Sequence, residues 1–405
     1  MRDAFKKVVI TGLGSISSLG HNTDEFWSGL CMGRSGIRPF VNIQTERLST
    51  KVGAEVINYS PEDYIPPKQL PLFDRFSQFA FIAGKEAIAD ASLSQDELHS
   101  AAAVLGTCLG AEHTYEESYC SLYEKGKSRV HPLTAPKGMP SAAVSQVSIQ
   151  FGIHGPVFAV CSACSSAAHA IIQAHMMIQN GLVDVAIAGG SEAPLSLVLI
   201  KSFEGLRALS KDTCRPFSYD RDGLVLGEGA GVVVLESLEH ATRRGADIYA
   251  ELSGYGMSSD AGHVTAPSVN GISQAISSAL SFAKVNPADV DYINAHGTGT
   301  KANDVAETEA INNVFGADAG NIAVSSTKSM HGHTLGAAGG LELVATVKAI
   351  KSGVVPPTIN FTKPGEECNL DYVPNKAREM EIDTALSNSF AFGGLNAVLV
   401  VRSIN

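Results

Sequence analysis

The chain has 405 residues, of which 44% are hydrophobic and 18% are charged, and its formal net charge is −11. This length is too great for one ordinary core, so two large domains or one intimate double domain are expected. The acidic balance argues against general nucleic-acid binding, and an acidic partner would need a local basic patch.

Short runs of β-branched residues alternate along the chain with Ala-rich segments of helical periodicity. In chain order, strands are predicted at residues 7–11, 103–106, 157–160, 183–188, 231–235, 249–256, 290–294, 322–325, 386–390 and 397–401. Helices are predicted between them, for example at residues 78–91, 166–179, 271–283 and 336–351. This alternation indicates a layered α/β architecture with helices between sheets.

The cysteine usage and the apolar segments indicate a cytoplasmic protein. The seven cysteines are an odd number and are scattered, which argues against a disulfide framework and favours a reducing compartment. The opening MRDAFKKVVITGLG leads directly into a strand, so no signal peptide is expected. Polar residues interrupt the longest apolar stretches, and no membrane span is predicted.

The segment FAVCSACSSAAHA, at residues 158–170, has the clearest chemical character. Cys164 falls at a strand-to-helix turn, where unpaired amide N–H groups and the helix dipole favour a thiolate. Small Ser and Ala neighbours leave room for a substrate, so a covalent nucleophile is predicted here. Cys161, three residues earlier, is expected to be structural, because a lone C-x-x-C lacks the second pair of a zinc site.

Three later segments have residues of chemical interest at predicted strand ends. YINAHGTGTKAND sets His296 directly after an apolar strand, and SSTKSMHGHTLGAAGG sets Lys328 and His333 after the next one. A buried His in such a position suits proton transfer or oxyanion donation. NSFAFGGLN places Phe390 and Phe392 beside a Gly pair, which allows close backbone approach to a ligand.

Other conspicuous residues are expected to be structural. His169 and His331 are interpreted as packing residues. The glycines of GLGSISSLG lack the G-x-G-x-x-G spacing of a dinucleotide loop, and GEGAG at residues 227–231 is expected to permit tight backbone packing. A faint internal repeat is also visible, in which a strand, a polar cluster and a helix follow in the same order around Cys164 and around His333. Such a repeat predicts two similar halves whose polar clusters face one cleft.

The blocks SACSSAAHA, NAHGTGTKAND, SSTKSMHGHTLGAAGGLE and NSFAFGGLNA resemble the four signatures of KAS II-type β-ketoacyl-acyl carrier protein synthases, condensing enzymes of the thiolase superfamily. VVITGLGSISSLG, RPFSYDRDGLVLGEGAG and GMSSDAGHVTAPS also match, so the resemblance covers essentially the whole chain. It implies a thiolase fold, a five-layer αβαβα stack of two similar halves. The nucleophile would lie in residues 1–250 and the histidines in residues 251–405.

The resemblance implies a Cys-His-His active site. The nucleophile falls on Cys164, the histidines on His296 and His333, the family's lysine on Lys328 and its buried glutamate on Glu342. The histidines are expected to be neutral Nε2–H donors with low pKa values.

The resemblance also implies residues that receive the substrate. The gating phenylalanine falls on Phe390, with Phe392 beside it, and the amides of Cys164 and Phe390 would form the oxyanion hole. Thr298 and Thr300 match threonines that contact the pantetheine arm of the carrier protein. Arg207 is a candidate for docking that acidic protein.

The implied reaction is the decarboxylative Claisen condensation of a Cys-bound acyl group with malonyl-acyl carrier protein, giving 3-ketoacyl-acyl carrier protein and CO2. No cofactor or metal is implied, and the partners are acyl carrier protein and a second subunit, in a homodimer or in a heterodimer with a chain-length-factor-like homologue. The alternative is a non-catalytic carrier-protein-binding or chain-length-factor-like subunit, which the nucleophile and both histidines argue against. A thiolase is disfavoured because NSFAFGGLN lacks a C-x-G cysteine.

The sequence departs from the usual family pattern in the gate segment. Ala391 stands where Gly is usual, and Leu395 where Thr is usual. The segments around Cys164 and after His296 look closer to nodulation-type, polyene and polyketide ketosynthases. Both fatty acid elongation and specialised chain building therefore stay open.

Overall fold

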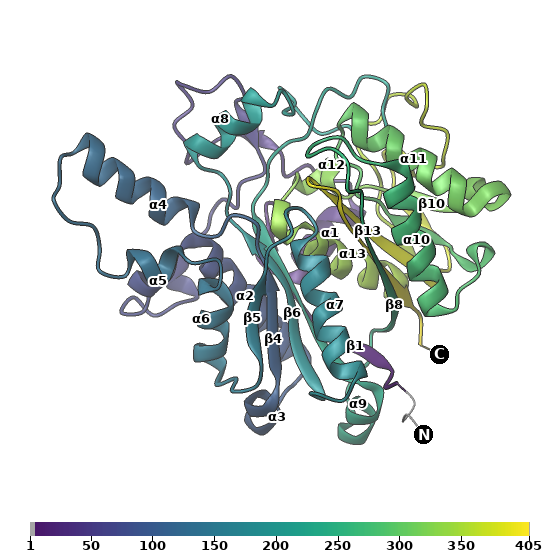
Figure 1. Cartoon of the computed structure of the whole chain (residues 1–405), viewed down its shortest axis with the longest axis horizontal. Coiled ribbons are helices and arrows are strands. Elements are labelled where there is room, and N and C mark those ends of the chain that lie inside the picture. The colour runs from purple at the N-terminus through teal and green to yellow at the C-terminus, as the bar shows by residue number, and fades with distance from the viewer. Residues whose placement is uncertain (1–4, 405) are drawn as a thin grey trace.

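The computed structural model describes residues 5–404, and its centre is a hydrogen-bonded array of ten strands (Figure 1). The array runs in the order β10-β9-β13-β14-β8-β1-β7-β6-β4-β5. In chain order these strands are β1 (Val8–Ser17), β4 (Ala102–Gly106), β5 (Val157–Val160), β6 (Val185–Glu192), β7 (Gly229–Ser237), β8 (Ala250–Ser259), β9 (Tyr292–Asn294), β10 (Ala323–Ser325), β13 (Thr384–Ala391) and β14 (Leu395–Arg402). Two small two-stranded sheets pair β2 (Arg38–Pro39) with β3 (Val52–Gly53) and β11 (Val354–Val355) with β12 (Arg378–Glu379).

The strand order has the same pattern when it is read inward from either edge. From one edge, β5, β4 and β6 are parallel, and β7 and β1 follow antiparallel. From the other edge, β10, β9 and β13 are parallel, and β14 and β8 follow antiparallel. The two sets of five meet at only two residue pairs, Val9 with Glu251 and Ile10 with Ala250. The molecule is therefore two similar five-stranded units, as the faint sequence repeat predicts.

Helices fill three layers around these two units, which gives the five-layer αβαβα stack of the thiolase fold. The central helices α7 (Ser166–Gln179) and α13 (Ala338–Ser352) contact each other and strands of both units. On the outer faces, α2 (Arg75–Asp90) and α6 (Ala142–Phe151) cover the first unit, and α10 (Val269–Ala283) covers the second with α11 (Lys301–Phe315) against it. The fold class expected from the sequence is confirmed.

Residue patterns explain how these helices pack. In α10 the buried side chains Ile272, Ala275, Ile276 and Ala279 recur at helical spacing on one face, and Ser268 caps the helix by accepting from the Gly271 amide. The central helix α13 has its side chains buried on nearly every face, as a helix between two sheets requires.

Glycines on two strands let helices approach closely. A Cβ at Gly231 of β7 would lie 2.2 Å from the Leu341 amide nitrogen of α13, so the tight packing predicted for GEGAG is confirmed. A Cβ at Gly14 would lie 1.9 Å from the Ala83 carbonyl oxygen of α2. The glycine-rich GLGSIS is therefore part of β1, which extends to Ser17, beyond the predicted end at residue 11.

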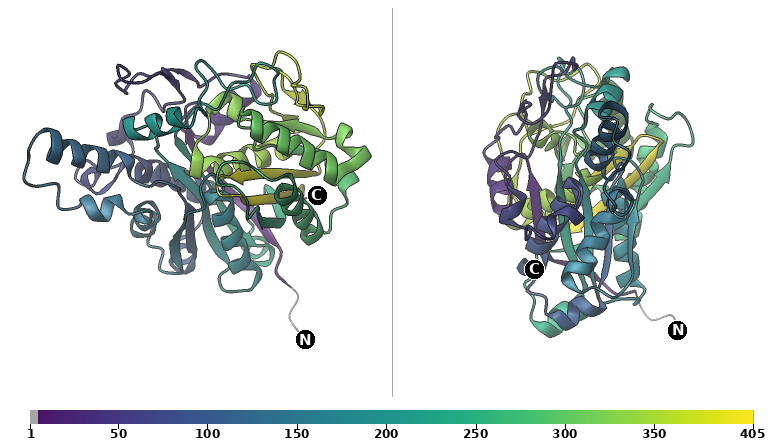
Figure 2. Two further views of the ribbon diagram at one scale, coloured as in Figure 1. Left: turned by 45° about the horizontal axis from the view of Figure 1, so that its top comes forward. Right: turned by 90° about the vertical axis from the view of Figure 1, so that its left-hand side faces the viewer.

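The remaining helices lie around the layers. The segment from α4 to α5 projects from the first unit (Figures 1 and 2). Among residues 5–404, no helix combines the length and the apolar character that crossing a bilayer needs. These helices are α1 (Thr23–Cys31), α3 (Gln95–Ser100), α4 (Glu112–Tyr119), α5 (Thr134–Gly138), α8 (Leu197–Gly205), α9 (Leu238–Arg244) and α12 (Lys328–His331).

Candidate active site

Cys164 lies in the connection 161–165 between β5 and α7, at the strand-to-helix turn that the sequence predicts. The preceding residue, Ala163, has φ +51°, a left-handed conformation that costs an L-residue about 1–2 kcal/mol. This turn leaves Cys164 on the wall of a cavity, with 8% of its surface exposed.

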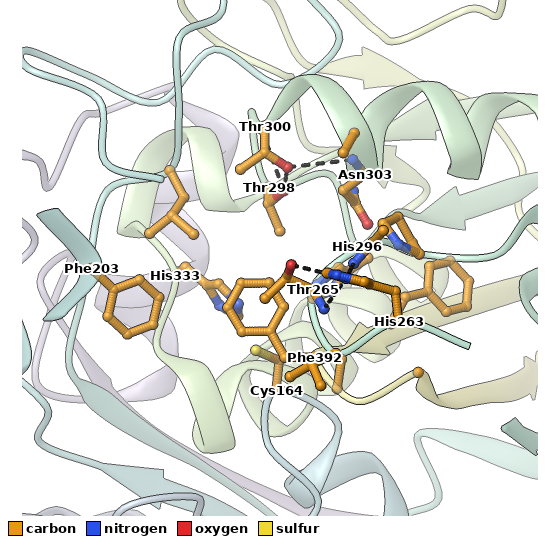
Figure 3. A pocket seen from close by; sticks show the side chains of 18 residues that line it. Cys164, Phe203, His263, Thr265, His296, Thr298, Thr300, Asn303, His333 and Phe392 are labelled. Carbon is orange, nitrogen blue, oxygen red and sulfur yellow. Dashed lines mark hydrogen bonds between the residues drawn. The ribbon is translucent and has the colours of Figure 1, made fainter. Parts of the chain in front are cut away.

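The cavity receives side chains from both halves of the molecule. Figure 3 shows the Cys164 thiol near the imidazoles of His296 and His333, with Thr298 and Thr300 across the cavity from it in this view. Phe390 and Phe392 also line the cavity. The structure thus brings together the nucleophile, both histidines, the phenylalanines and the threonines that the sequence singles out.

The two imidazoles are held by backbone contacts at strand and helix ends. His296 follows β9, and its amide donates to Glu307 Oε1 at 2.8 Å. His333 follows α12, and its amide donates to the Val225 carbonyl at 2.7 Å. The ring centroids lie 5.3 Å apart with the planes at 83°, and both side chains are buried.

A donor faces the Nδ1 atom of each imidazole and fixes its tautomer. Lys328 Nζ lies 3.4 Å from His296 Nδ1, and the Leu335 amide donates to His333 Nδ1 at 3.3 Å. Because these groups donate, each Nδ1 accepts, and the proton of each neutral ring sits on Nε2. Burial, followed by the charge of Lys328, holds the pKa of both rings well below the usual value. The expected neutral Nε2–H donors are therefore the form that this site favours.

The positive charge that acts on both rings belongs to a buried ion pair. Lys328, on α12, donates to Glu342 Oε1 on α13, and neither side chain is exposed to solvent. Burial raises the pKa of Glu342, and the neighbouring ammonium opposes that rise. The glutamate thus balances a cation that keeps two imidazoles uncharged.

The two phenylalanines occupy different positions at the end of β13. Phe390 lies in β13 opposite Asn396, and its ring lies 6.0 Å from the ring of His296. The backbone amide of Phe392, which follows the end of β13, lowers the pKa of Cys164. The expectation that Phe390 supplies the second oxyanion donor stays a prediction, and the amide that acts on the sulfur in this structure is that of Phe392. The Phe392 ring stacks on Phe203 at 6.4 Å.

The Cys164 thiol is not the preformed thiolate that its position before α7 suggests. Burial raises the pKa of Cys164 to about 11, outweighing the charge of Lys328 and the Phe392 amide, which lower it. The expectation that the helix terminus favours the thiolate is therefore wrong, because burial outweighs it. The thiol is neutral near pH 7.

Two buried carboxylates that the sequence analysis missed support the site. Glu192, at the end of β6, accepts from the Cys108 amide in the first half and from the Gly336 amide near His333 in the second. Glu307 accepts from the amides of His296 and Gly297 at 2.8 Å each. An acidic residue eleven positions after His296, on a helix that starts at the GTGT turn, was the available signal for Glu307.

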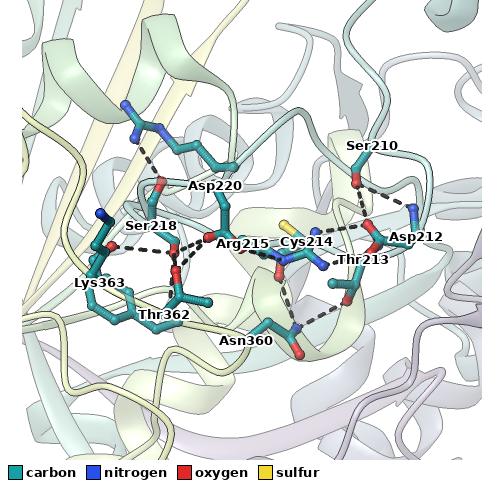
Figure 4. A network of polar contacts seen from close by, with 12 residues as sticks. Ser210, Asp212, Thr213, Cys214, Arg215, Ser218, Asp220, Asn360, Thr362 and Lys363 are labelled. Carbon is teal, nitrogen blue, oxygen red and sulfur yellow. Dashed lines mark hydrogen bonds and ion pairs between the residues drawn. The ribbon is translucent and has the colours of Figure 1, made fainter.

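A loop outside the cavity fixes the threonine turn. Cys214 Sγ donates to the Thr298 carbonyl at 3.4 Å, and the Phe217 amide donates to Asp304 on α11 at 2.7 Å. Figure 4 shows how a polar network holds this loop, in which Asn360 Nδ2 donates to the Cys214 carbonyl at 3.0 Å. The RPFSYDRDG segment therefore supports the turn that carries Thr298 and Thr300, whose Oγ1 atoms lie 2.9 Å apart.

The other singled-out residues lie outside this cluster. Arg207 follows α8, is exposed, and lines a neighbouring cavity of about 810 Å³ together with Thr300. His331 is buried, bonded to Thr327 Oγ1 at 3.0 Å, and burial lowers its pKa to about 3, which fits the structural role expected of it. His169 Nδ1 bonds Ser162 Oγ at 2.8 Å.

Within residues 5–404, no three His, Cys, Asp or Glu side chains gather as a metal site would need. The expectation that Cys161 is a buried structural cysteine is wrong, because Cys161 is exposed and unpaired, with its thiol 3.6 Å from the Cys108 carbonyl.

Comparison with known proteins gives matches along nearly the whole chain. The family model of the β-ketoacyl synthase N-terminal domain matches residues 5–241, and that of the C-terminal domain matches residues 249–362. Nodulation protein E of Rhizobium sp. (strain N33) is 50% identical over 401 residues, which cover 98% of this chain and 100% of that protein. The 3-oxoacyl-[acyl-carrier-protein] synthase 2 of Staphylococcus aureus (strain COL) is 44% identical over 407 residues, 98% of each chain.

Among solved structures, the ishigamide ketosynthase/chain length factor superposes with a TM-score of 0.96 at 37% sequence identity, covering 99% of this chain and 100% of that one.

Proposed function

This chain belongs to the β-ketoacyl synthase family of condensing acyltransferases, and we propose that Cys164, His296 and His333 perform its two half-reactions. The reaction condenses an acyl group with malonyl-acyl carrier protein and gives 3-ketoacyl-acyl carrier protein and CO2. It uses no cofactor or metal in this proposal, since the substrates arrive on the phosphopantetheine arm. The division of the chain at residues 250 and 251 stays a prediction.

In the first half-reaction, Cys164 attacks the thioester carbonyl of an acyl-carrier protein. A carbon–sulfur bond to Cys164 forms, the bond to the pantetheine sulfur breaks, and the thiol proton ends on the departing pantetheine thiol. The amides of Cys164 and Phe392 donate to the oxyanion, a role supported by the Phe392 amide already facing the sulfur.

In the second half-reaction, the malonyl thioester carbonyl accepts from the Nε2–H groups of His296 and His333. Loss of CO2 leaves an enolate on that oxygen, which the two donors stabilise. The enolate carbon attacks the acyl-Cys164 carbonyl, the new carbon–carbon bond forms, and the thiolate released takes up a proton. Neutral donors suit this step, because an imidazolium near Lys328 would be strongly disfavoured in a buried site.

One observation carries this proposal: both imidazoles on the cavity wall near Cys164 receive a donor at Nδ1 and so present Nε2–H. The alternative of a chain-length-factor-like subunit without catalysis is not favoured. A scaffold subunit has no use for a nucleophile facing two tautomerically fixed imidazoles.

The test is intact-protein mass spectrometry after incubation with a panel of acyl-carrier proteins. The wild type and the Cys161→Ala variant should gain the acyl mass, and Cys164→Ala should not. Malonyl-carrier protein should then release CO2 and discharge the adduct as 3-ketoacyl product. An adduct on Cys161, or carrier-protein binding without either half-reaction, would contradict the proposal.

We also propose that the chain works beside a second ketosynthase-like subunit, and two features support this. The strand β5 lies at the edge of the array with its residues only partly buried, and Phe158 is 37% exposed. An edge strand of this kind offers unpaired backbone groups to another strand. The ishigamide structure pairs a ketosynthase with a chain length factor. Light scattering of the chain alone distinguishes a homodimer from a chain that needs a homologue.

The remaining parts of the proposal concern docking and location. Thr298 and Thr300 would contact the pantetheine arm, and Arg207 at the neighbouring rim would attract the acidic carrier protein. A cytoplasmic location is supported by the seven unpaired cysteines, which suit a reducing compartment.

A further inference from the structure

Two exposed cations lie on the rim of the cavity that adjoins the active-site pocket. This outer cavity, about 810 Å³ in volume, shares Thr265, Thr300 and Phe392 with the inner pocket and adds Arg207 and Lys301 at its rim. The outer cavity therefore adjoins the wall of the inner pocket at the turn that carries Thr300. A ligand that extends from Cys164 past Thr300 would enter the outer cavity that these two cations line.

The charges of Arg207 and Lys301 are unmatched within residues 5–404, where no ion pair or side-chain hydrogen bond engages either group. Arg215, on the supporting loop nearby, is by contrast already paired with Asp212 at 2.6 Å and with Asp220 at 3.6 Å. On a chain of net charge −11, two free cations at one cavity mouth mark a local site for an anion.

The rim is held in place by its elements. Arg207 has φ +54° just after α8, and the turn is closed by its amide donating to the Glu204 carbonyl at 2.9 Å. Lys301 is the first residue of α11, whose N-terminus is capped by Thr300. Asp222 is the one acidic residue on this rim, and it is exposed.

We propose that Lys301 and Arg207 together bind the phosphate of the phosphopantetheine arm, so that this chain recognises the charge at the outer end of its substrate. The inference rests on the proposed function, which places the thioester at Cys164 and the arm along Thr298 and Thr300. The phosphate is the only charged group of the arm, and charge-assisted bonds from Lys and Arg are the usual means of holding it.

The first experiment measures binding without chemistry. Calorimetry compares 4′-phosphopantetheine with pantetheine on the full chain, and the phosphorylated ligand should bind roughly tenfold more tightly. The Lys301→Ala/Arg207→Ala double variant should lose this preference and keep its affinity for pantetheine. Asp222→Asn should strengthen binding of the phosphorylated ligand, because it removes the opposing charge. The control Lys351→Ala, an exposed lysine on α13, should change neither affinity.

Equal wild-type affinities for the two ligands would overturn the inference, and so would a double variant that weakens both ligands alike.

The second experiment separates the phosphate from the surface of the carrier protein. Cys164 acylation is compared with acyl-carrier protein, acyl-4′-phosphopantetheine and acyl-pantetheine as donors. The double variant should be slowed with the first two donors and unchanged with the third. Slowing with acyl-carrier protein alone would assign both residues to the protein surface and overturn the inference. If no donor acylates the wild type, the proposed function fails, while the calorimetric comparison still decides the phosphate site.

Discussion

The buried thiol makes a sharp prediction about the pH dependence of Cys164 alkylation. With a pKa of about 11, only about one thiol in a thousand is ionised at pH 8. The rate of alkylation by iodoacetamide should therefore rise roughly tenfold for each pH unit between 7 and 10, because the thiolate is the reactive form. A plateau is expected only above that range.

The charge of Lys328 opposes the rise in this pKa, so its removal should slow alkylation further. A double variant, Lys328→Met with Glu342→Gln, removes the cation without leaving an unbalanced buried carboxylate. At pH 8 it should react at least several-fold more slowly, since one pKa unit changes the thiolate fraction about tenfold. Cys161 is exposed, so a Cys161→Ala background and peptide mapping restrict the measurement to Cys164.

A rate that levels off below pH 8 would refute this reasoning, because it would show that the Cys164 thiol is already ionised at that pH. The expected behaviour has a consequence for catalysis. Ionising the thiol at pH 7.5 costs about 5 kcal/mol when its pKa is near 11. Proton removal must then be coupled to the arrival of the thioester, and the free protein keeps its nucleophile in the unreactive form.

Three further outcomes are expected. His333→Ala should slow malonyl decarboxylation by roughly a hundredfold or more and acyl transfer much less, because His333 donates to the enolate; equal loss in both half-reactions would count against that role. Because the pKa values of His296 and His333 are lowered, both rings stay neutral as the pH falls through 6.5. The rate of CO2 release should therefore be unchanged from pH 8 to 6. A loss of rate near pH 6.5 would show that the two histidines have the usual pKa and would contradict this reasoning. Glu342→Gln should lower the free energy of unfolding in urea by about 3–5 kcal/mol, since it leaves Lys328 buried without a counter-charge, and an unchanged midpoint would contradict the ion pair.

The sequence predicts local structure best where strong signals converge. The strand at residues 157–160 and the helix at 166–179 match β5 and α7, because an apolar run is followed by small residues and then by an Ala-rich helical pattern. The same reasoning ends β1 too early, because its glycine-rich second half is typical of a loop. Gly12 and Gly14 remain in the strand because α2 packs directly against it, which only the tertiary structure reveals.

Properties of the site that depend on burial from both halves could not be predicted. The position of Cys164 before α7 indicates a lowered pKa, but the side chains around the thiol come from both halves, among them Leu224 from the first and His296 and Phe390 from the second. The motif places the second oxyanion donor on Phe390, but it does not show where β13 stops pairing with β14. That end point decides that the amide of Phe392 is free to face the sulfur.

The mirrored strand order explains why the nucleophile and its imidazoles come from different halves. Cys164 precedes α7 and His333 precedes α13, and these two helices pack against each other in the central layer. The first half thus contributes the nucleophile and the second half contributes the imidazoles to the same cleft, and neither half alone contains a complete site. Glu192 couples the two, because it accepts amides from the loop beside Cys164 and from the turn after His333. This buried carboxylate therefore ties the loop at Cys108 in the first half to the turn at Gly336 in the second, and burial raises its pKa.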